Sequence, residues 1–209
     1  GEKLISFVGT VAFKNASGEV KTFKLSKHFR FLPNEYLFEL AVTIEGGENF
    51  EGLDFGNTSY TIRTAPQIGP DWDKNDRYDF RRFSLLINGK RKDMTVKAGE
   101  VKPGTGGSSL VAVSGKYFIF AVVPDATIDT VNFSADASGT QFETENTQAF
   151  ISQPAMRGSA LQNRYKVYIG PSGENYLYRY SNPSKNAFAV GNLGLENLAS
   201  SSGVLAPVI

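Results

Sequence analysis

Hydrophobic and polar residues alternate along most of the chain, and this pattern predicts a protein made mainly of β-strands. Between residues 28 and 45, apolar side chains occupy every second position on both sides of Pro33-Asn34, which separates two strands. Glu39 falls between the apolar positions, so we expect the second of these strands to have one face in water.

Residues 109–124 differ from this pattern, because apolar side chains occupy both the odd and the even positions over most of the stretch. It contains two hydrophobic runs, Leu110–Val113 and Tyr117–Val123, on either side of a Ser-Gly-Lys break. The second run is much shorter than the roughly 20 apolar residues that a bilayer span requires. It is rich in β-branched and aromatic residues and ends at a proline, which is typical of a strand buried on both faces. We therefore expect this run in the middle of a sheet.

Turn-forming residues divide much of the remaining chain into strands. Asn15–Gly18 predicts a hairpin turn, and Asn88-Gly89 is a strong signal for a type I′ hairpin. The residues between the turns predict strands at Leu4–Phe13, Glu19–Leu25, Ser59–Arg63, Arg81–Asn88, Lys92–Lys97, Thr127–Ser134, Thr140–Thr144, Gln148–Ser152 and Asn163–Ile169.

Other segments lack the alternation of apolar and polar residues that marks a strand. We expect residues 50–57 to form a loop, residues 64–79 an ordered loop or mobile lobe, and residues 98–108 a flexible glycine-rich connection. A short helix is predicted at Ser172–Tyr180, because a Ser or Gly cap precedes Glu174. Another is predicted at Asn192–Ser202, where leucines recur at a nearly helical spacing ahead of Gly203, a plausible C-cap.

The expected fold is therefore all-β, a large antiparallel β-sandwich formed by residues 1–209 as a single domain, with 172–209 as a helical tail. A chain of 209 residues can bury a sizeable core without disulfides, and its 16 phenylalanines and nine tyrosines supply apolar area. The chain begins without an initiator methionine and ends on Pro207-Val208-Ile209. We expect it to be a piece of a longer protein that continues into a hydrophobic segment.

Charge and cysteine content narrow the range of partners and chemistries. There are 22 basic and 21 acidic residues, a net charge of +1, which predicts no nucleic-acid partner. The densest basic cluster, Lys90-Arg91-Lys92, follows Gly89 and is interpreted as a solvated hairpin tip rather than a phosphate site. The absence of cysteine excludes disulfides, cysteine-ligated metals and thiol catalysis.

Histidine and aspartate motifs give little support for catalysis or metal binding. His28 is the only histidine, so a two-histidine metal site is excluded, and no nucleophile-elbow motif surrounds any serine. We interpret His28 as a rim or turn residue. Asp71, Asp73 and Asn75 resemble the start of a calcium loop, but that loop needs glycine where Asp76 stands and glutamate where Arg82 stands. An adventitious cation site there is the weaker alternative to a solvated loop.

Glycines, carboxylates and loop aromatics suggest no defined site either. Gly104–Gly107 lacks the Lys-Ser/Thr of a phosphate loop and is interpreted as a linker or hairpin tip. Any two carboxylates could converge as in glycoside hydrolases, but no motif marks a pair. Trp72 and Tyr78 could stack on a sugar, although covering the edge of the core is the favoured interpretation. We assign no catalytic, cofactor-binding or metal-ligating residue and leave the binding residues open.

Several motifs together resemble the large periplasmic domain of the YidC-type membrane protein insertases. They occur in the same order as in that family and span nearly the whole chain: HFRFLPNEYLFELAVTIE at 28–45, VAVSGKYFIFAVVP at 111–124, YKVYIGP at 165–171 and GVLAPVI at 203–209. Gly115 stands where the family usually has Asp, and Ser172 where it has Lys. Residues 59–82 fit the family less well.

The resemblance implies a β-supersandwich similar to galactose mutarotase, located in the periplasm and anchored to the inner membrane in the full-length protein. It also implies a role in inserting and folding inner-membrane proteins, alone or with the Sec translocon. Nascent membrane proteins and Sec accessory subunits are the implied partners. In this family the insertion step belongs to transmembrane helices, so the resemblance assigns no catalytic residue and no cofactor to this chain.

Two other functions remain open at this point. The implied fold also suggests a mutarotase-type enzyme, but such chemistry uses histidines with a carboxylate, and His28 stands alone. A carbohydrate- or peptide-binding module would instead need a concave face lined by several aromatic side chains. Similarity of fold to sugar-binding proteins is only an analogy for either function.

Overall fold

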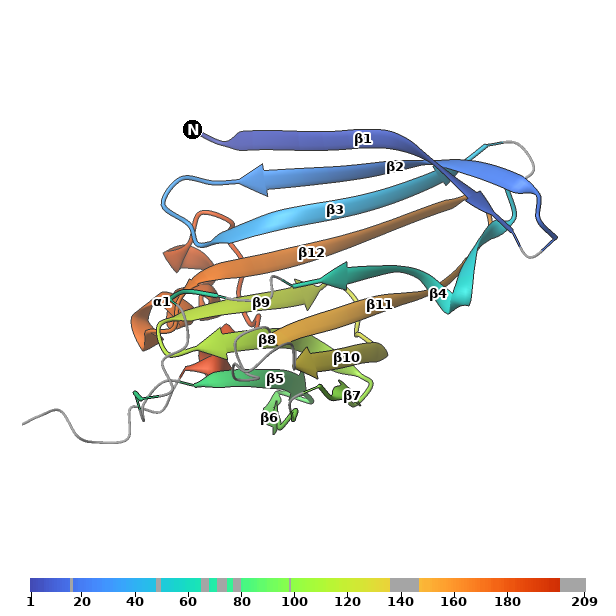
Figure 1. Cartoon of the computed structure of the whole chain (residues 1–209). Helices are drawn as coiled ribbons and strands as arrows, with labels where there is room; N and C mark the ends of the chain where they lie inside the picture. Colours follow the sequence, from blue (N-terminus) through green and yellow to red (C-terminus); the bar gives the residue numbers. More distant parts are fainter. Residues whose placement is uncertain are drawn as a thin grey trace, which may run out of the picture.

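Two antiparallel sheets and a short helical segment form the structure, a computed structural model that describes residues 1–15, 17–47, 50–64, 68–70, 75–76, 80–97, 99–135 and 147–199 (Figure 1). The large sheet has eight strands in the order β1-β2-β3-β12-β9-β8-β5-β6, and the small sheet has four in the order β4-β11-β10-β7. These findings confirm the all-β sandwich expected from the sequence.

The large sheet consists of β1 (Lys3–Lys14), β2 (Val20–Phe31), β3 (Leu37–Gly46), β12 (Ala160–Pro171), β9 (Phe118–Pro124), β8 (Ser108–Gly115), β5 (Arg81–Ile87) and β6 (Lys90–Met94). The small sheet consists of β4 (Gly52–Arg63), β11 (Thr147–Arg157), β10 (Thr130–Ala135) and β7 (Val101–Pro103). We call the side of the large sheet that packs on the small sheet its inner face, and the opposite side its outer face.

The hairpin β8–β9 lies inside the large sheet and supplies apolar side chains to both faces. Val111, Val113 and Val122 contribute to the core between the two sheets. The residues next to them, including Leu110 and Ala121, point to the outer face and join a second core there. The run predicted to be buried on both faces is confirmed as strand β9 from Ile119 onward, whereas Tyr117 and Phe118 at its start are 53% and 37% exposed.

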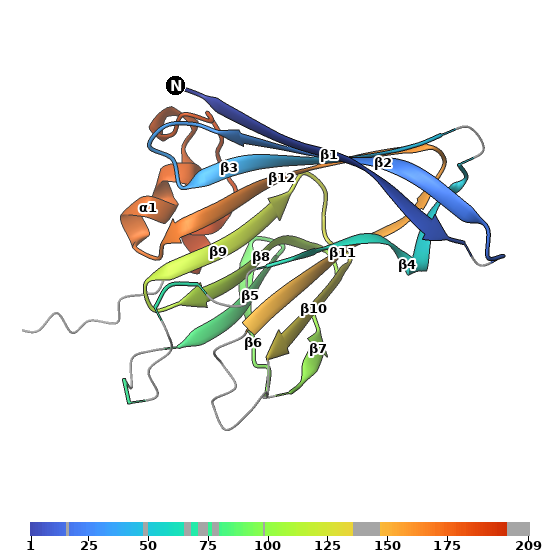
Figure 2. The same ribbon diagram turned by 45° about the horizontal axis from the view of Figure 1, so that its top comes forward.

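The second core lies beneath residues 172–199, which we call the C-terminal segment. It contains α1 (Glu174–Tyr178), η1 (Arg179–Ser181), η2 (Pro183–Lys185) and η3 (Leu195–Leu198), and it lies against the outer face of the large sheet (Figure 2). Leu177, Tyr180, Leu195 and Leu198 are all almost fully buried there. In the described part of the chain, none of these helices is both long and apolar enough to cross a bilayer.

A buried carboxylate, Glu35, fastens the C-terminal segment to the turn between β2 and β3. Its side chain is 0% exposed and accepts hydrogen bonds from Arg179 Nη2 at 2.7 Å, Tyr180 Oη at 2.8 Å and the backbone N–H of Ala187 at 2.6 Å. Arg179 also donates to the carbonyl oxygen of Asn34 at 3.0 Å. Three donors satisfy the buried charge, as burial of a carboxylate requires.

A small polar network crosses the core between the two sheets. Tyr60 on β4 donates to Oδ1 of Asn163 at 2.9 Å, and its hydroxyl oxygen lies 2.6 Å from that of Tyr165 on β12. Burial raises the pKa of Tyr165 to about 12. Burial and the hydrogen bond with Tyr165 raise the pKa of Tyr60 well above its usual range.

Most of the predicted strands and turns are confirmed, including the type I′ turn, where Asn88 and Gly89 both have positive φ. The loop predicted at residues 50–57 is wrong, because β4 begins at Gly52. Gly56 and Asn57 have left-handed backbone angles, and the pairing of β4 with β11 shifts register twice near Pro154. These irregularities remove the simple alternation by which a strand is recognised.

Two further segments differ from expectation. The glycine-rich stretch 98–108 contains the short strand β7, and the helix predicted at Asn192–Ser202 is a single 3₁₀ turn, η3. The helix predicted at Ser172–Tyr180 is present as α1, with Gly173 as its N-cap. The strand predicted at Thr140–Thr144 and the C-cap predicted at Gly203 lie outside the described residues.

Replacing Glu35 by alanine tests the attachment of the C-terminal segment. We expect Glu35→Ala to lower the free energy of unfolding by about 3 kcal/mol, because it leaves buried donors without an acceptor. Urea titration followed by circular dichroism measures this change. Glu45→Ala removes an exposed partner of Lys24 and is the matched control, with an expected change within about 0.5 kcal/mol. Equal effects of the two substitutions would contradict the role given to Glu35.

The buried tyrosines predict loss of stability at alkaline pH. A raised pKa in the folded state means that stability is complete below the unfolded value of about 10 and falls as pH rises through about 12. We expect the free energy of unfolding to be level from pH 8 to 9.5 and to decrease at pH 11. The double variant Tyr60→Phe/Tyr165→Phe should flatten that decrease. An unchanged slope in the double variant would show that other groups cause it.

Candidate functional site

A hollow of about 470 Å³ lies on the outer face of the large sheet, over β1, β2, β3 and β12. We call it the outer hollow. Its lining residues are Leu4, Ser6, His28, Phe29, Arg30, Glu39, Leu40, Ala41, Asp125, Arg164, Tyr165 and Lys166. Because its lining includes Ser6 and His28, the only histidine of the sequence, the outer hollow is the strongest candidate for a catalytic site.

The register of the strands arranges these side chains in two rows across the sheet. Ser6 lies opposite His28, His28 opposite Ala41, and Ala41 opposite Arg164. A second row lies two residues away from the first on each of the four strands. It contains Leu4, Arg30, Glu39 and Lys166. Because side chains two residues apart share a face, both rows point outward, and the small side chain of Ala41 leaves the space between them.

Charges in the second row are paired with opposite charges. Arg30 bonds to Glu2 at 2.7 Å and to Glu39 at 3.0 Å, while Lys166 bonds to Asp125 at 3.1 Å. The hydrogen bonds to Glu2 and then Glu39 raise the pKa of Arg30, so it remains cationic. Each of these three carboxylates therefore already has a cation as its hydrogen-bonding partner.

His28 and Ser6 are hydrogen-bonded, with 2.8 Å between Nδ1 and Oγ. A Ser-His nucleophile also needs a third group to orient the imidazole and donors to stabilise an oxyanion. Among the described residues, no carboxylate hydrogen-bonds to His28. His28 lies within β2 and is exposed, so it is a strand residue on an open face rather than the rim or turn residue expected from the sequence.

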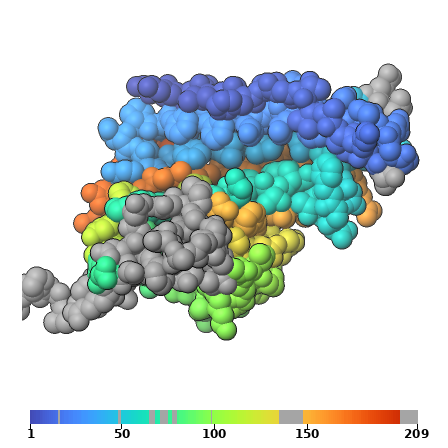
Figure 3. Space-filling view, viewed as in Figure 1, coloured from blue at the N-terminus to red at the C-terminus, as the bar shows by residue number. Residues whose placement is uncertain are grey.

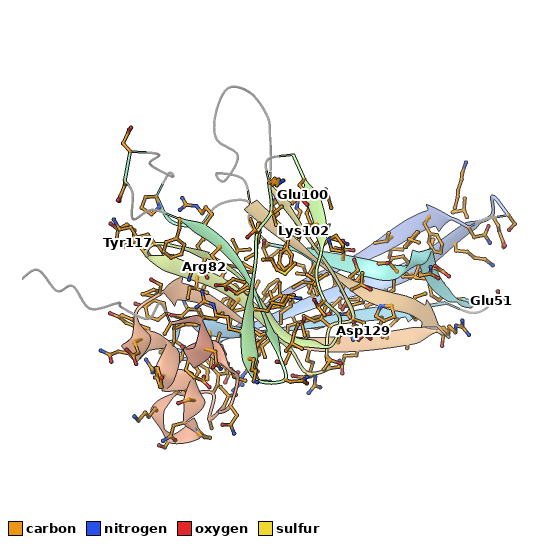
Figure 4. All side chains as sticks on the ribbon, turned by 90° about the horizontal axis from the view of Figure 1, so that it is seen from below. Glu51, Arg82, Glu100, Lys102, Tyr117 and Asp129 are labelled. Carbon is orange, nitrogen blue, oxygen red and sulfur yellow. The ribbon has the colours of Figure 1, made fainter. Side chains whose placement is uncertain are left out.

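The carboxylates of the described residues outside the outer hollow give no support for a metal site. Figure 4 shows Glu51, Glu100 and Asp129 in separate parts of the structure. Within the described ranges, no three His, Asp or Glu side chains are grouped closely enough to hold a metal ion. Asp71 and Asp73 of the calcium-like motif lie outside the described residues, as do Trp72 and Tyr78. Asp76 forms an ion pair with Lys116 at 2.6 Å.

The basic cluster at residues 90–92 is more than a solvated turn. Arg91 lies in β6 with its side chain only 18% exposed, and its Nη1 donates to the carbonyl oxygen of Leu198 at 3.2 Å. It therefore holds the end of η3, a long-range contact that no local pattern could predict. Gly104, whose absent Cβ would collide with Val131, connects β7 to β8 between the two sheets and is a linker rather than a hairpin tip.

The inner face of the same strands carries a different group of side chains, which we call the phenylalanine cluster. Phe7, Phe29, Phe31 and Phe38 contact one another with ring centroids 5.1–6.4 Å apart. Phe7 is 58% exposed and the other three are half-buried. Sequence periodicity places these side chains on the core face, but it does not show that they lie away from the centre of the sandwich. Exposed clustered aromatics are typical of interaction surfaces.

Comparison with known proteins identifies the family. Residues 10–196 match the model of the YidC periplasmic domain. The chain is 42% identical over 211 residues to the membrane protein insertase YidC of Treponema denticola, covering 100% of this chain and 36% of that protein. It is 30% identical over 237 residues to the membrane protein insertase YidC of Treponema pallidum, covering 100% of this chain and 38% of that protein.

The chain thus spans little more than a third of the length of the curated relatives that it matches. The family match starts within β1 and ends within η3, so it includes both sheets and most of the C-terminal segment. The ordered motifs at 28–45, 111–124 and 165–171 lie inside it and pointed to the same family. This chain therefore belongs to the family of YidC periplasmic domains.

Proposed function

We propose that this chain is the non-catalytic periplasmic part of a membrane protein insertase and assists inner-membrane proteins as they insert and fold. Its partners would be nascent membrane proteins and accessory subunits of the Sec translocon. The family match and the identity of both relatives as membrane protein insertases support the proposal. We further propose that residues 1–209 act as one unit, because the C-terminal segment packs on the large sheet through a shared core.

The chemistry of the outer hollow supports a non-catalytic role. Sugar-ring opening or hydrolysis requires a free acid and a free base on either side of the reacting bond. Here Glu39 and Asp125 are each held by a cation, and His28 has only Ser6 as a hydrogen-bond partner among the described residues. A row of compensated charges is what stabilises neighbouring strands on a wet face.

The phenylalanine cluster is the observation that best supports binding. Its rings present apolar area on strands β1 to β3, and an apolar segment of a client would bury that area on contact. Burial of apolar surface gives about 25 cal/mol per Å², and aromatic contacts add to this. A surface of this kind suits segments on their way to a membrane, which are apolar themselves.

Site-specific photocrosslinking tests this function in the full-length insertase that contains the chain. A photoreactive phenylalanine analogue would replace Phe7 or Phe29, and Tyr178, an aromatic residue of the C-terminal segment that is 47% exposed, would serve as the matched control position. During synthesis of a membrane protein, we expect several-fold more adducts to the nascent chain or a Sec subunit from the cluster than from the control. Equal, background-level adducts at all three positions would overturn the proposal.

Enzyme activity gives a separate readout for the non-catalytic part of this proposal. We expect the purified chain to leave the rate of glucose anomer exchange at the buffer value, because no free acid–base pair is present in the outer hollow. Polarimetry measures that rate. Exchange above the buffer rate that disappears in His28→Ala or Glu39→Gln would show that the chain is an enzyme.

A further inference from the structure

β1 is an edge strand of the large sheet with an exposed side. Among the strands of the described residues it pairs only with β2, and it runs along one rim of the molecule (Figures 1 and 3). Leu4, Ile5, Phe7 and Val8 are 71%, 45%, 58% and 58% exposed. The strand is 12 residues long, so a long row of backbone donors and acceptors faces outward.

The residues of β1 itself lack the charges, prolines and bulges that usually prevent an edge strand from pairing with another strand. Residues 4–13 contain no charge and no proline, and charges occur only at the ends, in Glu2, Lys3 and Lys14. Monomeric proteins usually protect an edge with an inward charge, a proline, a bulge or a covering loop. The pairing of β1 with β2 is regular over its whole length, so no bulge turns this edge away either.

The charges at the two ends make β1 complementary to itself. Two copies joined edge to edge about a twofold axis run antiparallel and keep their inner faces on the same side. Odd residues must then face odd residues and even residues must face even ones. Among such registers, the one centred on Val8 places Glu2 opposite Lys14 at both ends. It also places Phe7 opposite Gly9 and Leu4 opposite Ala12, a large residue against a small one each time.

We propose that β1 pairs with β1 of a second copy of this chain, centred on Val8, and joins the two large sheets into one continuous sheet. Main-chain hydrogen bonds hold the contact, and at each end Glu2, which also bonds to Arg30 of its own chain, forms an ion pair with Lys14. Because one strand from each copy buries less area than a standard protein interface, the association is weak and reversible. Phe7 belongs to both the phenylalanine cluster and this contact, but trapping in the purified chain tests the pairing in the absence of any client.

The cysteine-free sequence allows a direct test by disulfide trapping. In the proposed register Val8 faces Val8 with Cα atoms about 5 Å apart, a separation that a disulfide can bridge. We expect purified Val8→Cys to form a covalent dimer under mild oxidation. Ser6→Cys is the matched control, because it lies on the same face of β1 but about 13 Å from its counterpart. It should crosslink at least several-fold more slowly.

Charge reversal provides a second, independent readout. In the Val8→Cys background, Lys14→Glu should slow trapping, and adding Glu2→Lys should restore the rate. Sedimentation of the unmodified chain at rising concentration should show the same reversible dimer without any crosslink. Equal trapping of Val8→Cys and Ser6→Cys would indicate random collision and overturn the proposal. Faster trapping of Ser6→Cys would overturn this register, and a chain that stays monomeric with no trapping would show that β1 does not bind a second copy.

Discussion

The structure depends on one requirement: the apolar strands in the middle of the large sheet must be covered on both faces. Leucines and valines in β8 and β9 alternate between two cores, so one cover cannot bury them all. The small sheet covers the inner face, and the C-terminal segment covers the outer face. The helical segment is therefore a third layer packed on the large sheet, as its fully buried Leu177 and Tyr180 show.

The covers extend over only part of the large sheet, and the surface properties of the domain follow from this. Beyond the area that the C-terminal segment covers, the outer face carries the paired charges beside Ala41 in place of leucine and alanine. On the inner face, the core gives way to the phenylalanine cluster, whose rings are only partly buried. The end of the sheet formed by β1 to β3 thus offers a charged face, an aromatic face and an open edge to partners.

The sequence predicted the fold well wherever local patterns determine it. The period of two, the Asn88-Gly89 turn and the doubly apolar stretch 109–124 each reflect forces that act over a few residues. Prediction failed at β4, because Gly56 and Asn57 interrupt the alternation, and at Arg91, because its acceptor is more than 100 residues away. The functional surfaces could not be predicted in this way. Alternation of apolar and polar residues looks the same for a phenylalanine buried in the core and for one at the open end of a sandwich.

The bond network of Glu35 links residues that are about 150 positions apart in the chain, and this has a consequence for biogenesis. As a chain is synthesised from its N-terminus, the β2–β3 turn emerges long before Arg179, Tyr180 and Ala187 exist to bond with it. Until the C-terminal segment has been synthesised, the apolar residues of the outer core, including Leu110 and Ala121, remain uncovered. The fold can therefore be completed only after almost all of these residues have been synthesised. Chaperones that bind incomplete nascent chains have a long interval in which to act on it.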